Sequence, residues 1–357
     1  MIFSDVLSKW YKKNKRDLPW RHTKDPYKIW ISEIILQQTR VDQGLSYYYK
    51  FTGQYPDIQS LESDSEENVL RMWQGLGYYS RARNLHSAAK DIMARFDGKF
   101  PSNYQEIKSL KGIGEYTAAA IASFAYDLPH PVIDGNVNRL ISRFFGISEP
   151  IDSTKGKKIV EGLTKKVFDF SNPAQHNQAI MEFGALFCVP HNPDCQNCPL
   201  NASCIAFSTG MVKTLPIKKK KLKIKKRYFN YLLIKMDKQI AITKRIGNDI
   251  WKNMYQLPLL ETDGPQTPED LMEHVLWKQY LGSSLFTITA VEGPRIHKLS
   301  HQEIATQFIT IELTGEQIIQ NEYHKMISIE NISEYPIPKL IESFLDEKFI
   351  SYSPTTL

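Results

Sequence analysis

The chain has no cysteine outside one short stretch, residues 188–204, although it runs to 357 residues. It also has no apolar run approaching the ~18 residues that a membrane-spanning helix needs, and its first twenty residues have no apolar core of the kind found in signal peptides. These absences predict a protein of the reducing cytoplasm that does not span a membrane. Because disulfides are rare there, the four cysteines are predicted to bind metal rather than to pair.

The cysteines follow the spacing C-x6-C-x2-C-x5-C, with Cys188, Cys195, Cys198 and Cys204 as its members. Zinc ribbons have two C-x2-C pairs far apart, whereas here one pair has a single cysteine on either side. Zinc deaminases have an H-x-E motif upstream of their cysteines, and none lies upstream here. Neither common zinc pattern therefore fits the stretch.

The apolar periodicity changes in the middle of the chain. Over residues 1–210, apolar side chains recur at i, i+3 and i+4, which predicts a nearly all-α half. Over residues 228–350, alternating runs such as 227–236 predict strands and 268–281 predicts a helix, so a small α/β or α+β domain is expected. Residues 211–227 carry a dense run of lysines and are predicted to be a linker, either a solvated spacer or a segment along a phosphate backbone.

A Gly-x-Gly turn, Gly112 and Gly114, lies between two helical runs. Glycine permits the tight turn, and the free N–H groups of the next helix could bind a phosphate oxygen. An ordinary helical hairpin needs glycine equally often, so the turn decides nothing by itself. The net charge of +6 favours a nucleic-acid partner only weakly.

Two carboxylates have positions that suggest chemistry. If the segment around Glu33 is helical, Glu33 shares an apolar face with Ile29 and Leu36. Burial raises the pKa of a carboxyl group above ~4.3, so Glu33 could donate a proton near neutral pH; the alternative is a glutamate paired with a basic residue. Asp134 precedes a helical run, where the plain interpretation is a helix cap.

Several motifs together resemble the endonuclease III superfamily of DNA glycosylases. They are "LPWR" at 18–21, "EIILQQTRV" at 33–41, the glycine hairpin, and "DGNV" at 134–137. The resemblance covers nearly the whole chain, and within the superfamily it is closest to the branch that removes adenine opposite 8-oxoguanine or guanine, in base excision repair.

The resemblance implies a multidomain fold. It implies an all-α helix–hairpin–helix catalytic half over 1–210, with a six-helix module at about 25–137 and an iron–sulfur module formed by 1–24 and 138–210. The cysteine spacing matches the [4Fe–4S] site of that superfamily, which implies this cluster as a structural cofactor. Residues 228–350 resemble a Nudix domain without the acids of the hydrolase motif, and are expected to recognise the lesion without hydrolysis.

The same resemblance implies the chemistry. Glu33 would protonate the departing adenine, and Asp134 would stabilise the sugar cation or attack it covalently, two routes that the sequence leaves open. Tyr116 and Asn136 would position Asp134 and water. Since Tyr116 stands where strand-nicking members carry a lysine nucleophile, a monofunctional glycosylase is expected.

A set of substrate-binding residues is also implied. They are Trp20, Arg21 and Glu182 for adenine, Gln38 and Tyr78 as wedges in the base stack, Thr39 and Leu76 beside the lesion, Gly112 and Gly114 for phosphate, and Leu299, Ser300 and His301 for 8-oxoguanine. The last three depart from the Phe-Ser-His of the family, because leucine replaces the aromatic ring. The loop between the first two cysteines, "VPHNPD", is also less basic than usual for the family.

Two other functions fit parts of the sequence. A bifunctional endonuclease III-type lyase acting on oxidised pyrimidines is disfavoured by Tyr116 and by the second domain. A non-catalytic iron–sulfur module that binds DNA or senses redox state is disfavoured by the presence of both Glu33 and Asp134. The expected partner is duplex DNA containing A:8-oxoguanine or A:G, bound by a monomer in the cytoplasm at the nucleoid; a sliding clamp or mismatch-repair partner stays open.

Overall fold

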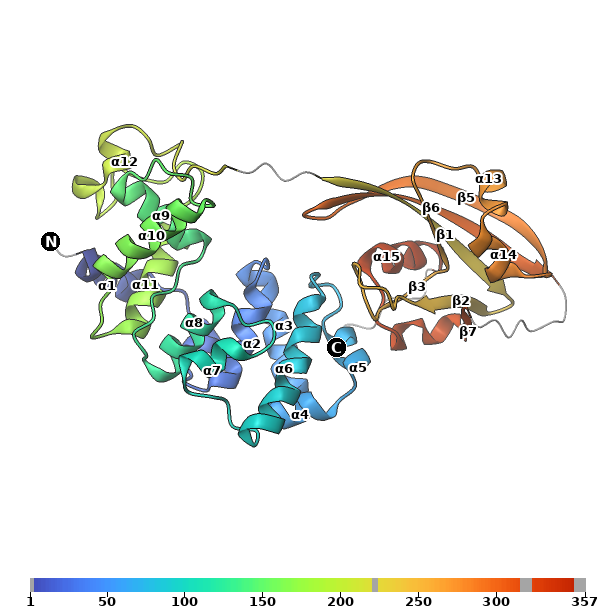
Figure 1. Ribbon diagram of the computed structural model, residues 1–357, viewed down its shortest axis with the longest axis horizontal. Coiled ribbons are helices and arrows are strands. Elements are labelled where there is room, and N and C mark those ends of the chain that lie inside the picture. Colours follow the sequence, from blue (N-terminus) through green and yellow to red (C-terminus); the bar gives the residue numbers. More distant parts are fainter. Residues whose placement is uncertain (1–2, 220–223, 315–322, 350–357) are drawn as a thin grey trace. The chain divides into compact units, whose positions relative to one another are not determined.

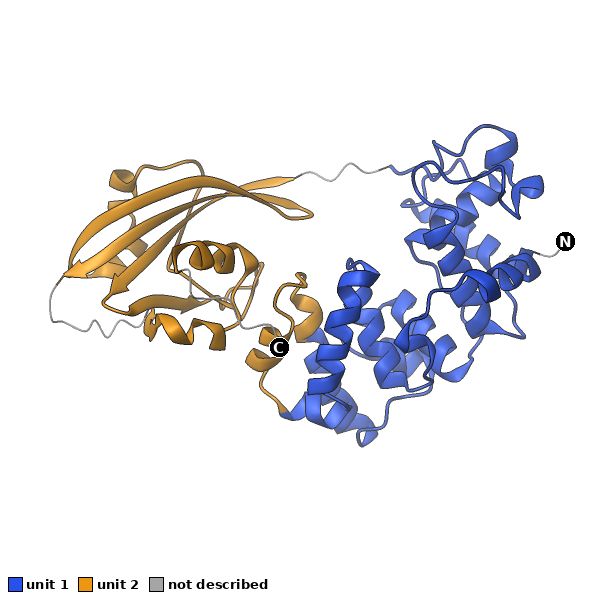
Figure 2. Ribbon diagram, turned by 180° about the vertical axis from the view of Figure 1, so that it is seen from behind, with its two compact units in different colours: residues 1–63, 84–221 blue, residues 64–83, 222–357 orange. Residues whose placement is uncertain are grey.

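The computed structural model describes residues 3–219, 224–314 and 323–349. The chain divides into two compact units, one of residues 1–63 with 84–221 and the other of residues 64–83 with 222–357 (Figure 2). Parts of the predicted linker (220–223) and of the predicted second domain (315–322 and 350), together with residues 1–2, lie outside the described residues.

The first unit is helical, as its periodicity predicts, and no strand occurs among its described residues (Figure 1). Its elements are α1 (Phe3–Asn14), η1 (Pro19–Arg21), α2 (Pro26–Leu36), α3 (Val41–Gln54), α4 (Ile58–Ser63), most of α6 (Ser80–Phe96), α7 (Tyr104–Ser109), α8 (Glu115–Tyr126), α9 (Gly135–Phe145), α10 (Thr154–Val167), α11 (Pro173–Leu186), η2 (Asn201–Ser203) and α12 (Ile205–Ser208). Helix α5 (Glu66–Met72) and the first residues of α6 belong to the second unit.

Helix α2 is the central helix of its module. It begins at Pro26 behind Asp25, whose carboxylate accepts a hydrogen bond from the Tyr27 amide, a favoured way to start a helix. Every residue from Ile29 to Ile35 is buried, and α2 packs against both α3 and α8. A helix that is apolar all round is buried all round, so Glu33 in its middle has little access to water.

The second unit is built on a mixed sheet. Its elements after α5 are β1 (Lys225–Met236), β2 (Gln239–Lys244), β3 (Tyr255–Gln256), β4 (Leu259–Thr262), α13 (Pro268–Met272), α14 (Val275–Leu281), β5 (Leu285–Lys298), β6 (Gln302–Thr314), β7 (Lys325–Ser328), η3 (Ile329–Glu334) and α15 (Lys339–Lys348). The strand order is β3-β2-β1-β6-β5, with β4 also paired to β1 and β7 to β2. Strands β1 and β6 run parallel, and the other pairs are antiparallel.

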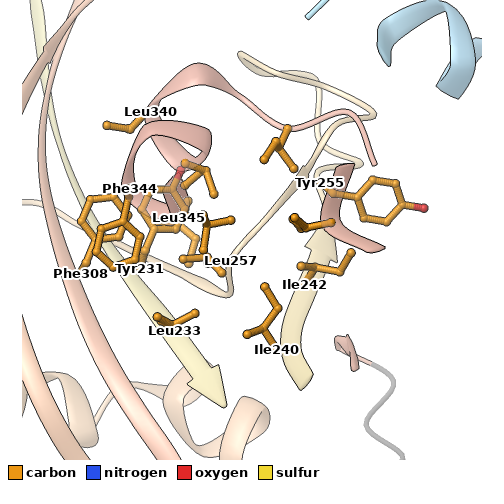
Figure 3. Close-up of a cluster of buried hydrophobic side chains, with 14 of the residues drawn as sticks. Tyr231, Leu233, Ile240, Ile242, Tyr255, Leu257, Phe308, Leu340, Phe344 and Leu345 are labelled. Atoms are coloured by element: carbon orange, nitrogen blue, oxygen red, sulfur yellow. The ribbon is translucent and has the colours of Figure 1, made fainter. Parts of the chain in front are cut away.

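Alternation along β1 gives the sheet two apolar faces, because successive strand residues point to opposite sides. Phe229, Tyr231 and Leu233 join a core that includes Phe344 of α15, whose ring stacks on Phe308 with centroids 3.8 Å apart (Figure 3). Leu232 and Ile234, with Trp277, Tyr280 and Leu281 of α14, belong to the core on the other face. The second half is thus an α/β domain with a helix layer on each face.

Two details differ from the sequence prediction. The segment 268–281 forms two short helices, α13 and α14, because His274 caps a new helix by accepting a hydrogen bond from Leu276 N. Strand β1 begins at Lys225, inside the predicted linker 211–227. The last three residues of that linker are therefore part of β1 and pair with β6. No described helix is both long and apolar enough to cross a membrane.

Candidate active site and substrate-contact residues

Glu33 is buried at the centre of α2, with 6% of its surface exposed. Burial raises the pKa of its carboxyl group to about 7, an effect that the hydrogen bond from Tyr116 partly offsets. A group with this pKa is partly protonated at neutral pH and can act as a general acid. The burial of Glu33 within α2 agrees with the apolar face that the sequence predicts, and its role as a proton donor stays a prediction.

Tyr116 lies in the first turn of α8, immediately after the glycine hairpin. Burial, and then the charges of Glu33 and Asp134, raise the pKa of its phenol well above 10, so the hydroxyl stays protonated and donates to Glu33. An open cleft of about 610 Å³ reaches Tyr116 and is lined on its other side by α10 residues such as Lys157. That volume lies in the range of small-molecule pockets.

Asp134 is the N-cap of α9, as the plain interpretation of the sequence expects. One carboxylate oxygen accepts from the Val137 amide at 2.7 Å, and the other accepts from the Asn136 side chain at 2.7 Å. Burial raises the pKa of Asp134 above its usual value, and these hydrogen bonds offset only part of that rise. Because the bonds and the positive end of the helix dipole favour the anion, Asp134 can carry a fixed negative charge beside Tyr116.

Behind Asp134, a chain of hydrogen bonds leads to the cysteine stretch. The Arg139 guanidinium donates to the Asn136 side-chain oxygen at 2.9 Å, to the Gly184 carbonyl at 2.6 Å and to the Cys188 carbonyl at 2.8 Å. A Cβ on Gly184 would lie 2.9 Å from the Asn136 carbonyl oxygen, so glycine is what lets α11 approach this turn. The sequence gave no sign of this role for Arg139.

Arg21 and Glu182, both expected at the adenine site, form an ion pair. Arg21 donates to both Glu182 oxygens, at 2.9 and 2.7 Å, and Arg16, which the sequence analysis missed, donates to the same carboxylate. Burial by itself raises the pKa of Glu182, but the bonds from Arg21 and Arg16 lower it to about 2. Trp20 is buried and packs edge-on against Tyr48. The pKa of Glu182 is thus lowered by its ion pairs, whereas the pKa of Glu33 is raised by burial.

The glycine hairpin has the predicted shape. Gly112 has a φ of +81°, and a Cβ there would lie 2.6 Å from the Asn84 Cβ atom, so both the conformation and the space require glycine. Gly114 is the N-cap of α8 and provides no side-chain cap. The amides of the first turn of α8 therefore have no side-chain acceptor from their cap residue, the arrangement that binds anions.

The two predicted wedge residues share an uncommon backbone conformation. Gln38 has a φ of +60° and Tyr78 a φ of +47°, and both side chains are exposed. Positive φ is rare for residues other than glycine and concentrates at functional sites. Thr39 follows Gln38 and is partly buried.

The second unit contains a cavity of about 480 Å³ that gathers five predicted residues. Its lining includes Leu76, Tyr78, Leu299, Ser300 and His301, and the Tyr78 hydroxyl hydrogen-bonds to the Ser300 hydroxyl.

The lining also includes a second segment, Asp249–Trp251, which the sequence analysis did not single out as a site. The segment belongs to the stretch "DIWKNMYQLPLLE", in which the spacing offers no signal of a cavity-facing indole.

The four cysteines line one small apolar cavity of about 30 Å³ together with Arg143. The buried Arg143 side chain donates to the carbonyls of Val189 and Pro190, at 2.7 and 2.9 Å, and lies 3.5 Å from the Cys188 sulfur. Among the described residues, no three His, Cys, Asp or Glu side chains are grouped closely enough to hold a metal ion. The sulfurs thus surround a space rather than a single point.

Comparison with known proteins agrees with this architecture. A family model described as "HhH-GPD superfamily base excision DNA repair protein" matches residues 31–168, and one described as "NUDIX domain" matches residues 230–347. The chain is 33% identical to the adenine DNA glycosylase of Buchnera aphidicola subsp. Schizaphis graminum, with 97% of this chain and 98% of that protein aligned. It is 38% identical to the human adenine DNA glycosylase over 57% of this chain and 39% of the human one. A solved thermostable thymine-DNA glycosylase superposes with a TM-score of 0.55 at 28% identity, covering 58% of this chain and 95% of that structure.

Proposed function

The chain belongs to the adenine DNA glycosylase (MutY) family of the HhH-GPD superfamily, and on that basis we propose that it excises adenine paired with 8-oxoguanine or guanine in duplex DNA. The protein is a DNA N-glycosylase of base excision repair. The proposal adds the mispair, hydrolysis without strand cleavage, and the residues responsible. The observation that carries it is the buried Glu33, whose pKa of about 7 suits proton donation to a leaving base.

The reaction proposed here begins with adenine outside the base stack, because its glycosidic bond cannot be reached inside a duplex. Glu33 donates its proton to a ring nitrogen of adenine, and the electrons of the C–N bond leave with the base. The sugar becomes an oxocarbenium ion, and Asp134 stabilises that positive charge before water completes the hydrolysis.

The supporting residues act through position. Tyr116 donates to Glu33 and, having no amine, cannot form a Schiff base with the sugar. Asn136 holds Asp134 by a 2.7 Å hydrogen bond. Arg21 and Arg16 fix Glu182 as an anion, so that Glu182 can accept a hydrogen bond but cannot compete with Glu33 as an acid. We place adenine near Trp20, Arg21 and Glu182.

The DNA-binding residues follow from the same proposal. Gly112 and Gly114 place the N-terminus of α8 against a phosphate, Gln38 and Tyr78 wedge the stack, and Thr39 and Leu76 lie beside the lesion. The catalytic half is assigned to residues 1–210, with modules at about 25–137 and at 1–24 with 138–210, and 228–350 is assigned to lesion recognition.

One assay tests the proposed function. The protein is incubated with duplexes carrying A opposite 8-oxoguanine, A opposite T, or thymine glycol, and each product is analysed with and without hot alkali. We expect cleavage of the A:8-oxoguanine duplex only after alkali, because base removal leaves an intact strand with an abasic site. Strand cleavage without alkali, or preference for thymine glycol, would instead identify a bifunctional lyase.

We propose that Cys188, Cys195, Cys198 and Cys204 hold a [4Fe–4S] cluster of structural rather than catalytic role. Support comes from the four sulfurs around one cavity and from the C-x6-C-x2-C-x5-C spacing of the cysteines. Arg143, buried beside Cys188, would offset the negative charge of the thiolates. Binding of the cluster would fix Cys188, whose carbonyl accepts a hydrogen bond from Arg139. Arg139 also bonds to Asn136, which in turn bonds to Asp134.

The protein purified anaerobically should contain about four irons per chain. Cys198→Ser should lower the iron content and the melting temperature together, whereas Ser203→Ala in the same loop should change neither. Elemental analysis and thermal melting measure both quantities. Stoichiometric zinc without iron would contradict the cluster assignment.

The turn Leu299–His301 is proposed to read the base opposite adenine. The Ser300 hydroxyl and the His301 imidazole can hydrogen-bond to the altered edge of 8-oxoguanine, which differs from that of guanine in its donors and acceptors. The double variant Ser300→Ala, His301→Ala should therefore slow excision opposite 8-oxoguanine by about 5- to 150-fold, the equivalent of ~1–3 kcal/mol, and slow excision opposite guanine less. Single-turnover rates on both duplexes at one salt concentration measure this; equal reductions would contradict a reading role.

A further inference from the structure

We propose that Trp251 is a further contact residue for the base opposite the excised adenine, and that Arg227 is the positioning residue that holds Trp251 beside the turn Leu299–His301. The inference rests on the proposed lesion-reading role of that turn. It adds a second recognition segment, Asp249–Trp251, to the cavity of the second unit.

Trp251 is held in a backbone conformation that a bulky residue rarely adopts. Its φ is +58°, and Asn253 two residues later has a φ of +64°. Such outliers persist only where the surroundings impose them, and they concentrate at binding sites. Here Arg245 imposes the turn: its side chain donates to the Ile250 carbonyl at 3.0 Å, and its own carbonyl accepts from Asn253 N at 2.7 Å.

The indole of Trp251 packs against the core of the second unit and also lines the cavity. It packs against the core on the α15 face of the sheet together with Leu299, and its ring contacts those of Phe229 and His297 at centroid distances of 6.4 and 5.9 Å. It also lines the cavity that Ser300 lines. A supported aromatic ring beside hydrogen-bonding groups is the arrangement that binds a flat base, by stacking and by contacts to the base edge.

The need for a ring at this place follows from the sequence of the turn. Leu299 provides an apolar side chain but no π-face, so the turn Leu299–His301 cannot stack on a purine except through the His301 imidazole. Trp251 comes from a different loop, between β2 and β3, and brings a larger ring to the same cavity. Trp251 thus adds to the cavity a larger aromatic face than the His301 imidazole of the turn.

Arg227 connects the two segments that line the cavity, Asp249–Trp251 and the turn Leu299–His301. Its guanidinium donates to both oxygens of Asp249, at 2.9 and 2.6 Å, and to the side-chain oxygen of Gln302 at 3.0 Å. Asp249 begins the Trp251 segment, and Gln302 directly follows the turn. The backbone adds a further bond, from Lys225 N to the His301 carbonyl at 3.0 Å, because β1 and β6 pair in parallel at this end.

The burial of Arg227 suggests a role beyond stability. The side chain is 7% exposed and also pairs with Glu261 at 2.6 Å. Buried ion networks are costly to desolvate, and apolar residues of similar volume often stabilise a core as well or better. A planar guanidinium, however, can bond several acceptors in fixed directions, which lysine cannot do. Arg227 is thus suited to holding the segment Asp249–Trp251 and the turn Leu299–His301 in a fixed relative position.

The test uses the full-length protein and single-turnover excision on A:8-oxoguanine and A:G duplexes at one salt concentration. Trp251→Ala should raise the protein concentration for half-maximal excision opposite 8-oxoguanine about 5- to 150-fold, which corresponds to the ~1–3 kcal/mol of stacking on one base, and should raise it less opposite guanine. Trp251→Phe should retain most of the affinity because a ring remains.

A second pair of variants tests the positioning role of Arg227. Arg227→Lys keeps the charge but cannot bond Asp249 and Gln302 together, so the preference for 8-oxoguanine should fall as it does in Trp251→Ala. Glu261→Gln is the matched control, because Glu261 pairs with the same guanidinium but lies outside the cavity lining as described. This variant should keep the preference, and melting temperatures of all variants show whether the domain stays folded.

The outcomes separate this inference from the proposed function. If Trp251→Ala behaves as the unchanged protein while the Ser300→Ala, His301→Ala variant loses its preference, the Trp251 contact is wrong and the lesion-reading turn stands. If the double variant keeps its preference, the lesion-reading role itself fails. Equal losses on both duplexes in Trp251→Ala and Trp251→Phe, with lower melting temperatures, would show a structural role and overturn the contact. An unchanged preference in Arg227→Lys would overturn its positioning role.

Discussion

Replacing Glu33 by glutamine is expected to reduce single-turnover excision of adenine by at least ~10²–10⁴-fold, the usual contribution of general acid–base catalysis. Glutamine has the same shape and can still accept a hydrogen bond from Tyr116, but it has no acidic proton to donate. Binding of the A:8-oxoguanine duplex should therefore stay close to normal. Glu62→Gln, a change of the same kind on α4, is the matched control and should leave the rate unchanged.

The pH dependence of the unchanged protein provides an independent check on Glu33. Burial raises the pKa of Glu33 to about 7, and only the protonated form can donate. The rate of base removal should thus be high below pH 7 and should fall as the pH rises through that value. At low pH the rate should also fall, because Asp134 becomes protonated. Single-turnover rates between about pH 5 and 9 measure this. A rate that stays constant up to pH 9, or a Glu33→Gln variant with a near-normal rate, would remove Glu33 from the mechanism.

Replacing Asp134 by asparagine is expected to reduce excision by ~10²–10³-fold, as loss of one electrostatic stabiliser of a transition state does in other enzymes. Asparagine is as good a helix cap as aspartate, so the hydrogen bond from Val137 N and the start of α9 should persist. What disappears is the negative charge that faces the sugar cation. The melting temperature should therefore change little while the rate falls.

A matched variant distinguishes charge from capping. Asp25 is also an aspartate N-cap, of α2, and accepts from Tyr27 N at 2.9 Å. Asp25→Asn makes the same chemical change at a helix start without a proposed role in the reaction, so its excision rate should stay normal. An Asp134→Asn variant that is no slower than Asp25→Asn would show that Asp134 acts only as a cap.

The environments of Glu33 and Glu182 illustrate how one fold separates two carboxylates. Burial raises the pKa of both side chains, but at Glu33 the hydrogen bond from Tyr116 offsets only part of that rise, whereas two guanidinium groups bond to Glu182 and lower its pKa. Their pKa values consequently lie at about 7 and about 2. Opposite shifts of this kind are how active sites assign one group to donate protons and another to remain charged.

The sequence by itself determined the features that depend on residues close together in the chain. The spacing of apolar residues predicted a helical first half and a second half with strands, because a helix and a strand turn their side chains with different periods. Asp134 as a cap needs only the amide three residues later, and the turn at Gly112 needs only the tolerance of glycine for positive φ. The motifs around Glu33 and Tyr116 were equally local.

Tertiary structure decided the properties that depend on groups far apart in the chain. Whether Glu33 and Glu182 are protonated depends on burial and on partners such as Tyr116 and Arg16, which the fold brings from distant elements, and desolvation and ion pairing both fall off over a few ångströms. For the same reason, no pattern in the sequence marked Trp251 as a neighbour of Ser300. Arg227, which the sequence placed at the end of a lysine-rich linker and the start of a predicted strand, is buried because parallel pairing of β1 with β6 carries it into the sheet, beside the carboxylates of Asp249 and Glu261.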